Sequence, residues 1–342
     1  MSLDKHSFFN NIIKTQNQHI VLSVLKEKNI ELYIKREDQI HPLVSGNKFR
    51  KLKYNLQEAT NQQKKTLLTF GGAFSNHIVA TAVAGTLHDF RTIGIIRGDE
   101  LGKDVAKTLA NNSTLRKASE YGMKFEFISR EYYREKTRPQ FIETLQEKHG
   151  DFYSIPEGGT NELAIKGCEE ILTTEDSQFD YICSCVGTGG TISGIINNAK
   201  NHQKVLGFPV LKGDFLENEI LKYAKKQENW ELNNDYHFGG YGKYSDELIH
   251  FINRFKSQTD IPLDPIYTGK MMFGVLDMIN KKRFPNGSKI LIIHSGGIQG
   301  IAGFNHRLKS KFSDLNYVIS LNNSTLKETF NSLGVTFTLS KN

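Results

Sequence analysis

Residues 180–200 read DYICSCVGTGGTISGIINNAK, and this stretch decides the fold. A short apolar run at 180–185 ends in a glycine-rich turn at 187–190, and a stretch with helical periodicity follows at 191–200. Short apolar runs bounded by glycine are typical of strands buried on both faces. Strand, turn and helix in this order form the unit from which parallel sheets are built. The stretch therefore predicts one βα unit of an α/β protein.

The same alternation continues outward along the chain in both directions. Short apolar runs predict further strands at 66–70, 91–97, 124–128, 152–155, 204–207 and 289–294. Amphipathic stretches predict further helices at 76–88, 104–121, 132–149, 162–173, 245–258 and 270–283, and another from about Lys48 to Ala59. Strands that alternate with helices predict an α/β fold with open, mostly parallel sheets flanked by helices.

The composition limits the class of protein. The 342 residues suffice for one large α/β domain or two smaller ones. No stretch approaches the ~18 consecutive apolar residues of a membrane span. The first residues lack the apolar centre of a signal peptide. The three cysteines, Cys168, Cys183 and Cys185, form no C-x-x-C pair and are typical of buried thiols in a reducing compartment. We expect a cytoplasmic protein with no membrane contact and no metal site.

The formal net charge of +7 raises the question of nucleic acid. The basic residues are spread along the chain, however, and most are lysine, the usual charge of a solvated surface. We therefore expect no nucleic-acid partner. A mild positive field would also attract a small anion.

Glycine clusters follow three of the predicted strands. They are Gly71-Gly72, the run from Gly187 to Gly190, and Gly296-Gly297. In open α/β sheets, ligands bind beyond the carboxyl ends of the strands. The pattern predicts that the three turns line one crevice at the top of a sheet.

The turn at 187–191 favours an anion. Its small residues let backbone N–H groups converge at the start of a helix, where the helix dipole adds partial positive charge, and the hydroxyls of Thr188 and Thr191 can donate as well. No Gly-Lys-Ser/Thr follows, and Ile192 occupies the third glycine position of a dinucleotide fingerprint. A phosphate monoester is therefore favoured over ATP or NAD. The alternative is a tight turn without a ligand.

Two other segments carry candidate chemistry. In SGNKFRK at 45–51, Lys48 lies beside a glycine, with Arg50 and Lys51 close by. Neighbouring cations or desolvation lower the pKa of a lysine and make it a Schiff-base nucleophile, but a solvated cationic face fits equally well. In GGAFSNH at 71–77, Ser75 and Asn76 can hold a carboxylate or simply cap the following helix. We expect His77 to support this turn rather than to act as a catalyst.

Two tyrosines lie in turns marked by glycine or proline. Tyr241 occurs in FGGYGK and Tyr267 in DPIYTGK. A phenol in such a place can act as a general acid or base. The alternative for each is a packing role.

Together the motifs resemble those of the fold-type II pyridoxal-phosphate enzymes, in the branch of 1-aminocyclopropane-1-carboxylate (ACC) deaminase and D-cysteine desulfhydrase. The resemblance runs from about Ile34 to Gly300. It rests on GNKFRKL at 46–52, GGAFSNH at 71–77, GTGGTISG at 187–194, GYG at 240–242, DPIYTGK at 264–270 and HSGG at 294–297. Their order and separations are similar to the family's.

The resemblance implies pyridoxal 5′-phosphate as the cofactor, with a Schiff base on Lys48, and a small amino acid as the substrate. Asn76 resembles the residue that hydrogen-bonds the cofactor's 3′-oxygen. The expected cofactor-binding residues are Lys48, Lys51, Asn76, Gly187, Thr188, Gly189, Gly190, Thr191 and Thr268. The turn that would hold the substrate carboxylate comprises Ser75, Asn76 and His77. The implied catalytic set is Lys48, Ser75, Tyr241 and Tyr267.

Thr268 bears on the choice of reaction. By resemblance it faces the pyridine nitrogen, where ACC deaminases carry glutamate and D-cysteine desulfhydrases are similar to this sequence. A carboxylate there would keep the nitrogen protonated and strengthen the electron sink, whereas a hydroxyl can only hydrogen-bond. We therefore expect α,β-elimination, foremost of D-cysteine to pyruvate, ammonia and sulfide.

Several alternatives stay open. The nearest is an ACC deaminase that yields 2-oxobutanoate and ammonia, and a more distant one is a non-catalytic cofactor-binding protein. The tyrosine pair argues against a dehydratase or a β-replacing synthase. Two departures from the branch concern the substrate: Phe74 stands where glutamine is usual, and extra sequence follows Gly296-Gly297.

The resemblance also implies the architecture. It is that of a two-domain tryptophan-synthase-β-like fold with the cofactor between the domains. The large cofactor-binding domain would comprise 1–47 and 157–342, and the small α/β domain 48–156. A homodimer is expected on the same ground.

Overall fold

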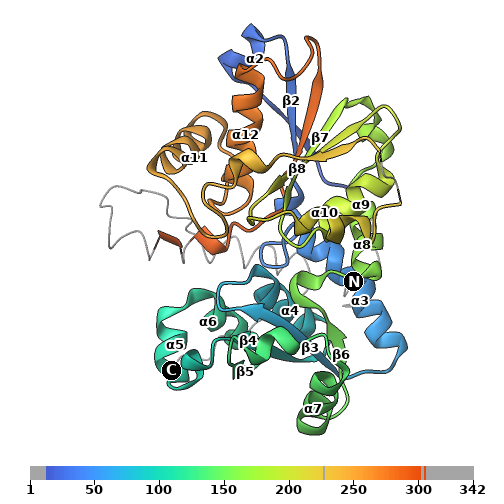
Figure 1. Ribbon diagram of the computed structural model, residues 1–342, viewed down its shortest axis with the longest axis vertical. Coiled ribbons are helices and arrows are strands. Elements are labelled where there is room, and N and C mark those ends of the chain that lie inside the picture. Colours follow the sequence, from blue (N-terminus) through green and yellow to red (C-terminus); the bar gives the residue numbers. More distant parts are fainter. Residues whose placement is uncertain (1–12, 226–227, 302–303, 306–342) are drawn as a thin grey trace, which may run out of the picture.

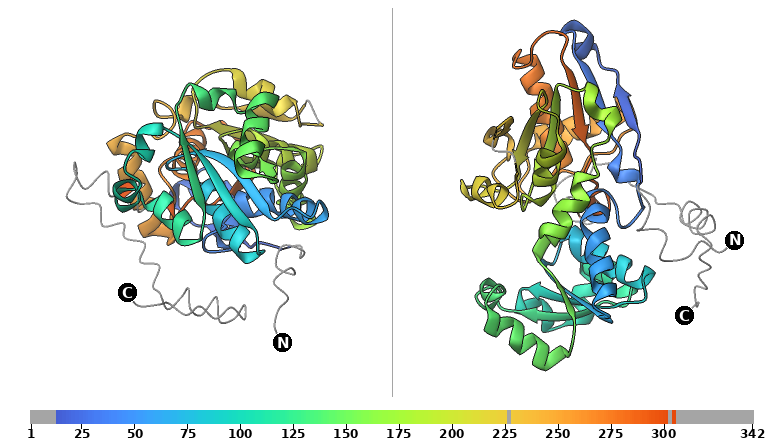
Figure 2. Two further views of the ribbon diagram at one scale, coloured as in Figure 1. Left: turned by 90° about the horizontal axis from the view of Figure 1, so that it is seen from below. Right: turned by 90° about the vertical axis from the view of Figure 1, so that its right-hand side faces the viewer.

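The computed structural model describes residues 13–225, 228–301 and 304–305. Within them the chain forms two separate sheets, which lie at opposite ends of the longest axis (Figure 1; Figure 2, right). Helices cover both faces of each sheet. The predicted α/β class, with open and mostly parallel sheets flanked by helices, is confirmed. Along the described part of the chain, no helix combines the length and apolarity needed to cross a bilayer.

The larger sheet has six strands. Its order is β1 (Asn17–Ile20), β2 (Glu31–Lys35), β10 (Lys289–Ile293), β7 (Tyr181–Val186), β8 (Lys204–Pro209) and β9 (Trp230–Leu232). Only β1 is antiparallel to its neighbour. One face packs on α2 (Ser23–Glu27), α11 (Asp246–Thr259) and α12 (Thr268–Asn280), and the other on α8 (Glu162–Glu169), α9 (Gly190–Asn198) and α10 (Phe215–Leu221). The central strands β7 and β10 are almost wholly buried because helices cover both faces, which explains their continuous apolar sequence.

The smaller sheet has four parallel strands. Its order is β5 (Lys124–Ile128), β4 (Arg91–Arg97), β3 (Thr66–Gly72) and β6 (Tyr153–Ile155). One face packs on α3 (Asn47–Asn61), α4 (Asn76–Leu87) and α6 (Ser113–Glu120), and the other on α7 (Pro139–His149). The helix α5 (Val105–Asn111) has no buried residue. Short 3-10 turns complete the element order at Glu37–Gln39, Asp99–Gly102, Tyr132–Glu135, Glu157–Gly159, Thr174–Gln178 and Asn234–Tyr236.

The structure corrects several predicted elements. The expected helix at 104–121 is two helices, because Asn112 leaves the helical conformation and its side chain caps the second one at Leu115 N. The expected helix at 132–149 begins only at Pro139, whose missing N–H suits a first turn. The strands β1, β2 and β9 and the helices α2 and α10 were not predicted. Four of these five have only three to five residues, and in β1 and β9 most residues are partly exposed, so their sequence pattern is weak.

Helix α3 lies between the two sheets. It contributes Phe49, Leu52 and Leu56 to the core of the four-stranded sheet, and it also packs along α8 of the six-stranded sheet. The predicted domain limits, 48–156 against 1–47 with 157–342, stay a prediction. The tail after Arg307 lies outside the described residues.

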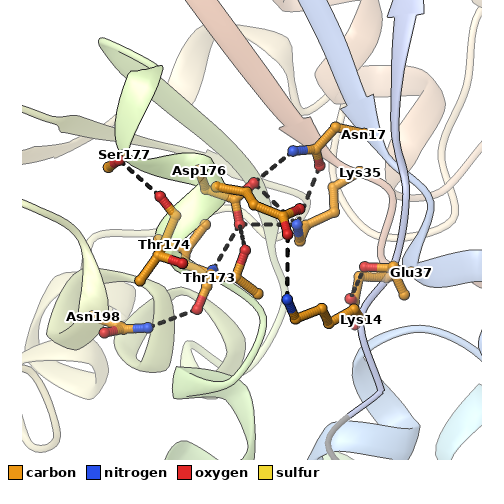
Figure 3. Close-up of polar contacts among 12 residues, drawn as sticks. Lys14, Asn17, Lys35, Glu37, Thr173, Thr174, Asp176, Ser177 and Asn198 are labelled. Atoms are coloured by element: carbon orange, nitrogen blue, oxygen red, sulfur yellow. Dashed lines mark hydrogen bonds and ion pairs between the residues drawn. The ribbon is translucent and has the colours of Figure 1, made fainter.

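A buried ion pair fixes the antiparallel edge of the larger sheet (Figure 3). Lys35 in β2 donates to both carboxylate oxygens of Asp176, at 3.0 and 2.9 Å, and each side chain is 1% exposed. Asn17 in β1 donates to the same carboxylate at 2.7 Å, and so does the backbone N–H of Thr173. One carboxylate thus joins β1, β2 and the turn that precedes β7.

We expect Asp176→Ala to destabilise the protein strongly. It would leave the Lys35 ammonium buried without a counter-charge, a change that costs about 3–5 kcal/mol. The measurement is the midpoint of urea unfolding followed by circular dichroism. The neighbouring Glu175→Ala is the control, because Glu175 pairs with Lys14 at the surface, where a pair contributes about 1 kcal/mol or less. Equal midpoints for the two variants would contradict the prediction.

Candidate active site

Gly46 determines where the first turn of α3 lies. Its backbone has φ +60°, and a Cβ there would lie 2.0 Å from the carbonyl oxygen of Ser295. The next residue, Asn47, donates its N–H to that same oxygen at 3.2 Å. Only glycine allows this approach. Helix α3 therefore begins against the segment that leaves β10, and Lys48 lies in its first turn.

Lys48 has the properties of a reactive amine. Its Nζ donates to the Asn47 side chain at 2.9 Å, and among the described residues no carboxylate forms an ion pair with it. Burial lowers the pKa of Lys48, while Cys168, Cys185 and Asp264 partly oppose this shift. A larger neutral fraction makes the amine a better nucleophile. Burial rather than Arg50 produces the shift, since the Arg50 guanidinium is paired with Glu37 at 2.9 Å.

Lys51 lies one turn further along α3 and is only 2% exposed. Its Nζ donates to the carbonyl oxygen of Gly158 at 3.0 Å, to Thr160 Oγ1 at 2.9 Å and to Thr188 Oγ1 at 3.4 Å. All three acceptors are neutral. Burial lowers the pKa of Lys51 to about 7, and the charge of Lys48 adds to the effect. An anion beside this ammonium would supply the counter-charge that the protein itself does not provide.

The predicted anion turn lies directly against Lys51. Gly189 is left-handed, with φ +82°, and α9 begins at Gly190. A Cβ on Gly190 would lie 3.1 Å from Lys51 Nζ. Asn47 also donates to Thr191 Oγ1 at 2.8 Å, which ties the start of α3 to the start of α9. Gly187 to Thr191 and Lys51 thus form one cationic, donor-rich corner that suits a phosphate.

The turn at 71–77 comes from the other sheet and meets the glycine turn at 296–297. Ser75 occupies the N-cap of α4, but its side chain makes no capping hydrogen bond. The Nδ2 atom of Asn76 lies 3.3 Å from where a Cβ on Gly297 would stand. The expectation that three glycine turns top one sheet is therefore wrong, because β3 belongs to the four-stranded sheet. The turns meet across the space between the two sheets.

His77 and Asn112 stabilise the turn at 71–77 through hydrogen bonds to Thr69 and Ala73. His77 is 1% exposed, and its Nε2 donates to Thr69 Oγ1 at 2.9 Å, because the Thr69 hydroxyl itself donates to Ile155 O. Burial, with the charges of Lys48 and Lys51, keeps the pKa of His77 well below its ordinary value, so the ring is neutral. Asn112 donates to the carbonyl oxygen of Ala73 at 3.0 Å. Sequence reasoning found His77 but missed Asn112.

The two tyrosines meet on the opposite side of the anion turn. A Cβ on Gly187 would lie 3.3 Å from the ring of Tyr267, so this ring borders the turn. The rings of Tyr267 and Tyr241 are 6.1 Å apart and inclined at 72°. Burial raises the pKa of Tyr267 well above its ordinary value, and the neighbouring Tyr241 adds to the shift. Tyr267 therefore stays protonated at neutral pH and can donate a proton.

Thr268 is bonded to a carboxylate. Its hydroxyl donates to Asp264 Oδ2 at 2.8 Å and accepts the N–H of Asp264 at 2.9 Å. Asp264 also accepts the backbone N–H groups of Ile266, Tyr267 and Thr268, and so caps α12. The Thr268 hydroxyl has already donated its proton to Asp264, so it can only accept a hydrogen bond from a further group.

Sequence reasoning missed the second wall of the anion corner. Gly158, Gly159 and Thr160 follow β6, and Thr160 Oγ1 lies 2.6 Å from Thr188 Oγ1. A glycine pair after a strand is the same signal that marked the other three turns. It was available in the sequence at 158–159.

The comparisons with known proteins agree with this geometry. The family model described as "Pyridoxal-phosphate dependent enzyme" matches residues 17–296. The chain belongs to this family. It is similar to the bifunctional D-cysteine desulfhydrase/ACC deaminase of Arabidopsis thaliana, named as mitochondrial, with 32% identity over 79% of this chain and 73% of the relative. It is also similar to an ACC deaminase of Rhizobium rhizogenes, with 28% identity over 82% and 91%.

A solved structure of an ACC deaminase homologue has a TM-score of 0.73 and 28% identity, over 91% of this chain and 99% of that one. The protein is therefore a pyridoxal-phosphate-dependent enzyme of the ACC deaminase/D-cysteine desulfhydrase family. The residues present fit the cofactor. The buried ammonium of Lys51, with only neutral acceptors around it, suits the phosphate, and Lys48, three residues before it, has an amine with a lowered pKa. Among the described residues, no cluster of three or more potential ligands could hold a metal ion.

We expect the cofactor-free enzyme to bind inorganic sulfate with an affinity that falls as the pH rises above 7. The pKa of Lys51 is about 7 without a ligand, and a bound anion raises it, so binding above pH 7 must take up a proton. Sulfate keeps its own charge throughout this range. Calorimetric titration at pH 7, 8 and 9 measures the effect.

Lys51→Met tests the assignment of this pH dependence. Losing one charge-assisted hydrogen bond should weaken binding by about 1.5–3 kcal/mol at pH 7, which is roughly 10- to 150-fold. The residual affinity should change less with pH than in the wild type. A pH slope that is unchanged in the variant would assign the proton uptake to another group.

Proposed function

We propose that this enzyme catalyses the α,β-elimination of a small amino acid, foremost D-cysteine, to pyruvate, ammonia and sulfide. The observation that carries the proposal is a base and an acid at the same anion corner. Burial lowers the pKa of Lys48, which favours the neutral amine that can accept a proton, whereas the raised pKa of Tyr267 keeps its phenol protonated, so that a proton is present there. Elimination needs both: a proton leaves Cα and the departing sulfur takes one up.

The cofactor would be held by residues of both sheets. Gly187 to Thr191 and Lys51 would hold its phosphate, and the Lys48 amine would hold it covalently. Asn76 would bond the 3′-oxygen, and Thr268 would face the ring nitrogen. When bound, pyridoxal phosphate supplies the electron sink that stabilises negative charge at the substrate Cα.

The substrate carboxylate would dock on the turn that opens α4. The Ser75 hydroxyl makes no capping hydrogen bond and can donate to this carboxylate. The N–H groups at the start of the twelve-residue helix α4 add partial positive charge. The Asn76 side chain lies at the same turn. Because the His77 ring is buried and bonded to Thr69, His77 would contribute through its backbone. Asn112 would keep the turn in place through Ala73.

The pKa directions of Lys48 and Tyr267 are the basis for assigning the two proton transfers. The Lys48 amine would take the α-proton, and the Tyr267 phenol would donate to the departing sulfur. Tyr241 is 45% exposed and lies beside Tyr267, so it can return the proton from the solvent side. The threonine at 268 favours elimination over ring opening, because it presents a hydroxyl where a carboxylate would strengthen the sink.

The second candidate is the opening of ACC. The observation in its favour is Asp264, whose carboxylate accepts the Thr268 hydroxyl at 2.8 Å. Because that hydroxyl then offers a lone pair, it would favour a protonated ring nitrogen, as a direct carboxylate would. Related proteins are also named ACC deaminase. A homodimer in the cytoplasm is part of the proposal, and light scattering after size-exclusion chromatography would measure the assembly.

We expect pyruvate release from D-cysteine, and little 2-oxobutanoate from ACC, when the purified enzyme is tested with both. The two keto acids are separated by chromatography. Lys48→Ala should remove the visible absorbance of the bound cofactor and the turnover together. Release of 2-oxobutanoate alone would select the second candidate. A Lys48→Ala variant that keeps both properties would refute the role of Lys48.

We expect Thr268→Glu to raise the ratio of ACC opening to D-cysteine elimination by about tenfold or more, which corresponds to about 1.4 kcal/mol in the barrier. The carboxylate would hold the ring nitrogen protonated directly. Thr268→Ser, which keeps the hydroxyl, is the matched control and should leave the ratio unchanged. An unchanged ratio in the glutamate variant would remove the argument from the ring nitrogen.

A further inference from the structure

We propose that Lys270 is a positioning residue, whose buried ammonium ties the loop that carries Tyr241 to helix α12 and so holds Tyr241 against Tyr267. The inference rests on the proposed function in one respect, namely that the two tyrosines act on the substrate.

Lys270 is unusual among the buried cations. Of the lysines and arginines that are buried in the described part of the chain, four are paired with carboxylates: Lys35 with Asp176, Arg36 with Asp38, Arg50 with Glu37 and Lys53 with Glu170. The other two are Lys51 and Lys270, which have only neutral acceptors. Lys51 lies at the anion corner. Lys270 is 1% exposed and does not lie at the anion corner. The cost of burying its charge therefore needs another explanation.

The acceptors of Lys270 supply that reason. Its Nζ donates to the carbonyl oxygens of His237 and Gly240, both at 2.9 Å. The same two carbonyls close consecutive turns, since His237 O accepts Gly240 N and Gly240 O accepts Lys243 N. Tyr241 lies in the second turn. One ammonium therefore holds both turns of this loop at their closing points.

The loop has a backbone that needs such support. Phe238, Gly239, Gly240 and Gly242 all have positive φ, at 52°, 91°, 112° and 67°. Glycine-rich backbone loses more conformational entropy on ordering than other backbone. An external tether can offset that cost, and Lys270 is placed to provide it.

The segment that carries Tyr241 packs along one face of α12. Lys270, Phe273 and Asp277 are spaced three and four residues apart and so lie on one face of the helix. The ring of Phe238 packs on Phe273 at 5.1 Å, and the Tyr236 hydroxyl donates to Asp277 at 2.6 Å. These two contacts hold the start of the segment. Lys270 in turn bonds the carbonyl of Gly240, the residue directly before Tyr241.

The geometry links this tether to the tyrosine pair. Tyr267 occupies the N-cap position of α12, three residues before Lys270, so both tyrosines are placed by the same helix turn. The rings meet at 6.1 Å, and Tyr241 adds to the raised pKa of Tyr267. Burial lowers the pKa of Lys270 to about 8, with Asp264 opposing the shift. Loss of the tether would let Tyr241 move away from Tyr267.

The test compares wild-type and Lys270→Met holoenzymes by hydrogen exchange with mass spectrometry. Methionine fills similar space but cannot donate. We expect backbone amides in the peptide 236–244 to exchange at least tenfold faster, with the core strands unchanged. Lys222→Met, which removes an exposed lysine directly after α10, should match the wild type. Unchanged exchange in 236–244 would overturn the proposal, whatever the turnover.

A double-mutant cycle with Tyr241→Phe tests the positioning role. Lys270→Met should lower kcat in the wild-type background but have little further effect once the phenol is gone. Equal losses in both backgrounds would overturn the link to Tyr241. If the wild type shows no elimination, the proposed function fails, and the exchange experiment still decides the tether.

Gly240→Ala covers the case in which Lys270→Met does not fold. A side chain at φ +112° is strained, so the carbonyl of Gly240 should shift while Lys270 stays intact. We expect the same faster exchange in 236–244 and the same loss of kcat. Wild-type exchange and kcat in this variant would overturn the proposal.

Discussion

The active site depends on amines that are buried without a carboxylate partner. Apart from Lys270, the other buried cations of the described chain pair with Asp or Glu, and they hold elements together. Lys51 has only neutral oxygens around it, so burial lowers its pKa and it favours any anion that can enter. The same effect lowers the pKa of Lys48 and so raises the neutral fraction of its amine. The protein thus provides the site with cations and leaves the counter-charge to the ligand.

Helix α3 carries both kinds of cation: those that pair with a carboxylate and those that have no carboxylate partner. Arg50 and Lys53 reach Glu37 and Glu170 and fasten the helix to the segment after β2 and to the end of α8. Asn47 then reaches Thr191 in α9, and Lys51 reaches Thr188 in the turn before it, with Lys48 between the two along α3. Gly46 makes this possible because no other residue could pass so close to Ser295. The reactive lysine is placed by its neighbours' ion pairs as much as by its own contacts.

The sequence predicted what local pattern determines. The central strands, the anion turn and the helices around them could be placed because continuous apolar runs and glycine pairs carry a strong signal. The sequence did not reveal which strands share a sheet, so the three turns were placed on one sheet instead of two. Asn112 interrupts a helical pattern because it caps α6 and bonds Ala73, a contact 39 residues away. Lys270 stood inside a quoted motif, but its acceptors lie 30 and 33 residues earlier in the chain.

The start of α12 concentrates the groups on which the choice of reaction depends. Tyr267, Thr268 and Lys270 occupy one turn, and Asp264 caps it by accepting three backbone N–H groups. In the proposed function, a change at Thr268 would alter what faces the ring nitrogen, but the hydroxyl is also bonded to the cap. Because the cap orients the helix that bears Tyr267 and tethers Tyr241, the proposed proton donors and the proposed partner of the ring nitrogen would be mechanically coupled. Elimination and ring opening can therefore differ by a single side chain only if that side chain leaves the Asp264 cap intact.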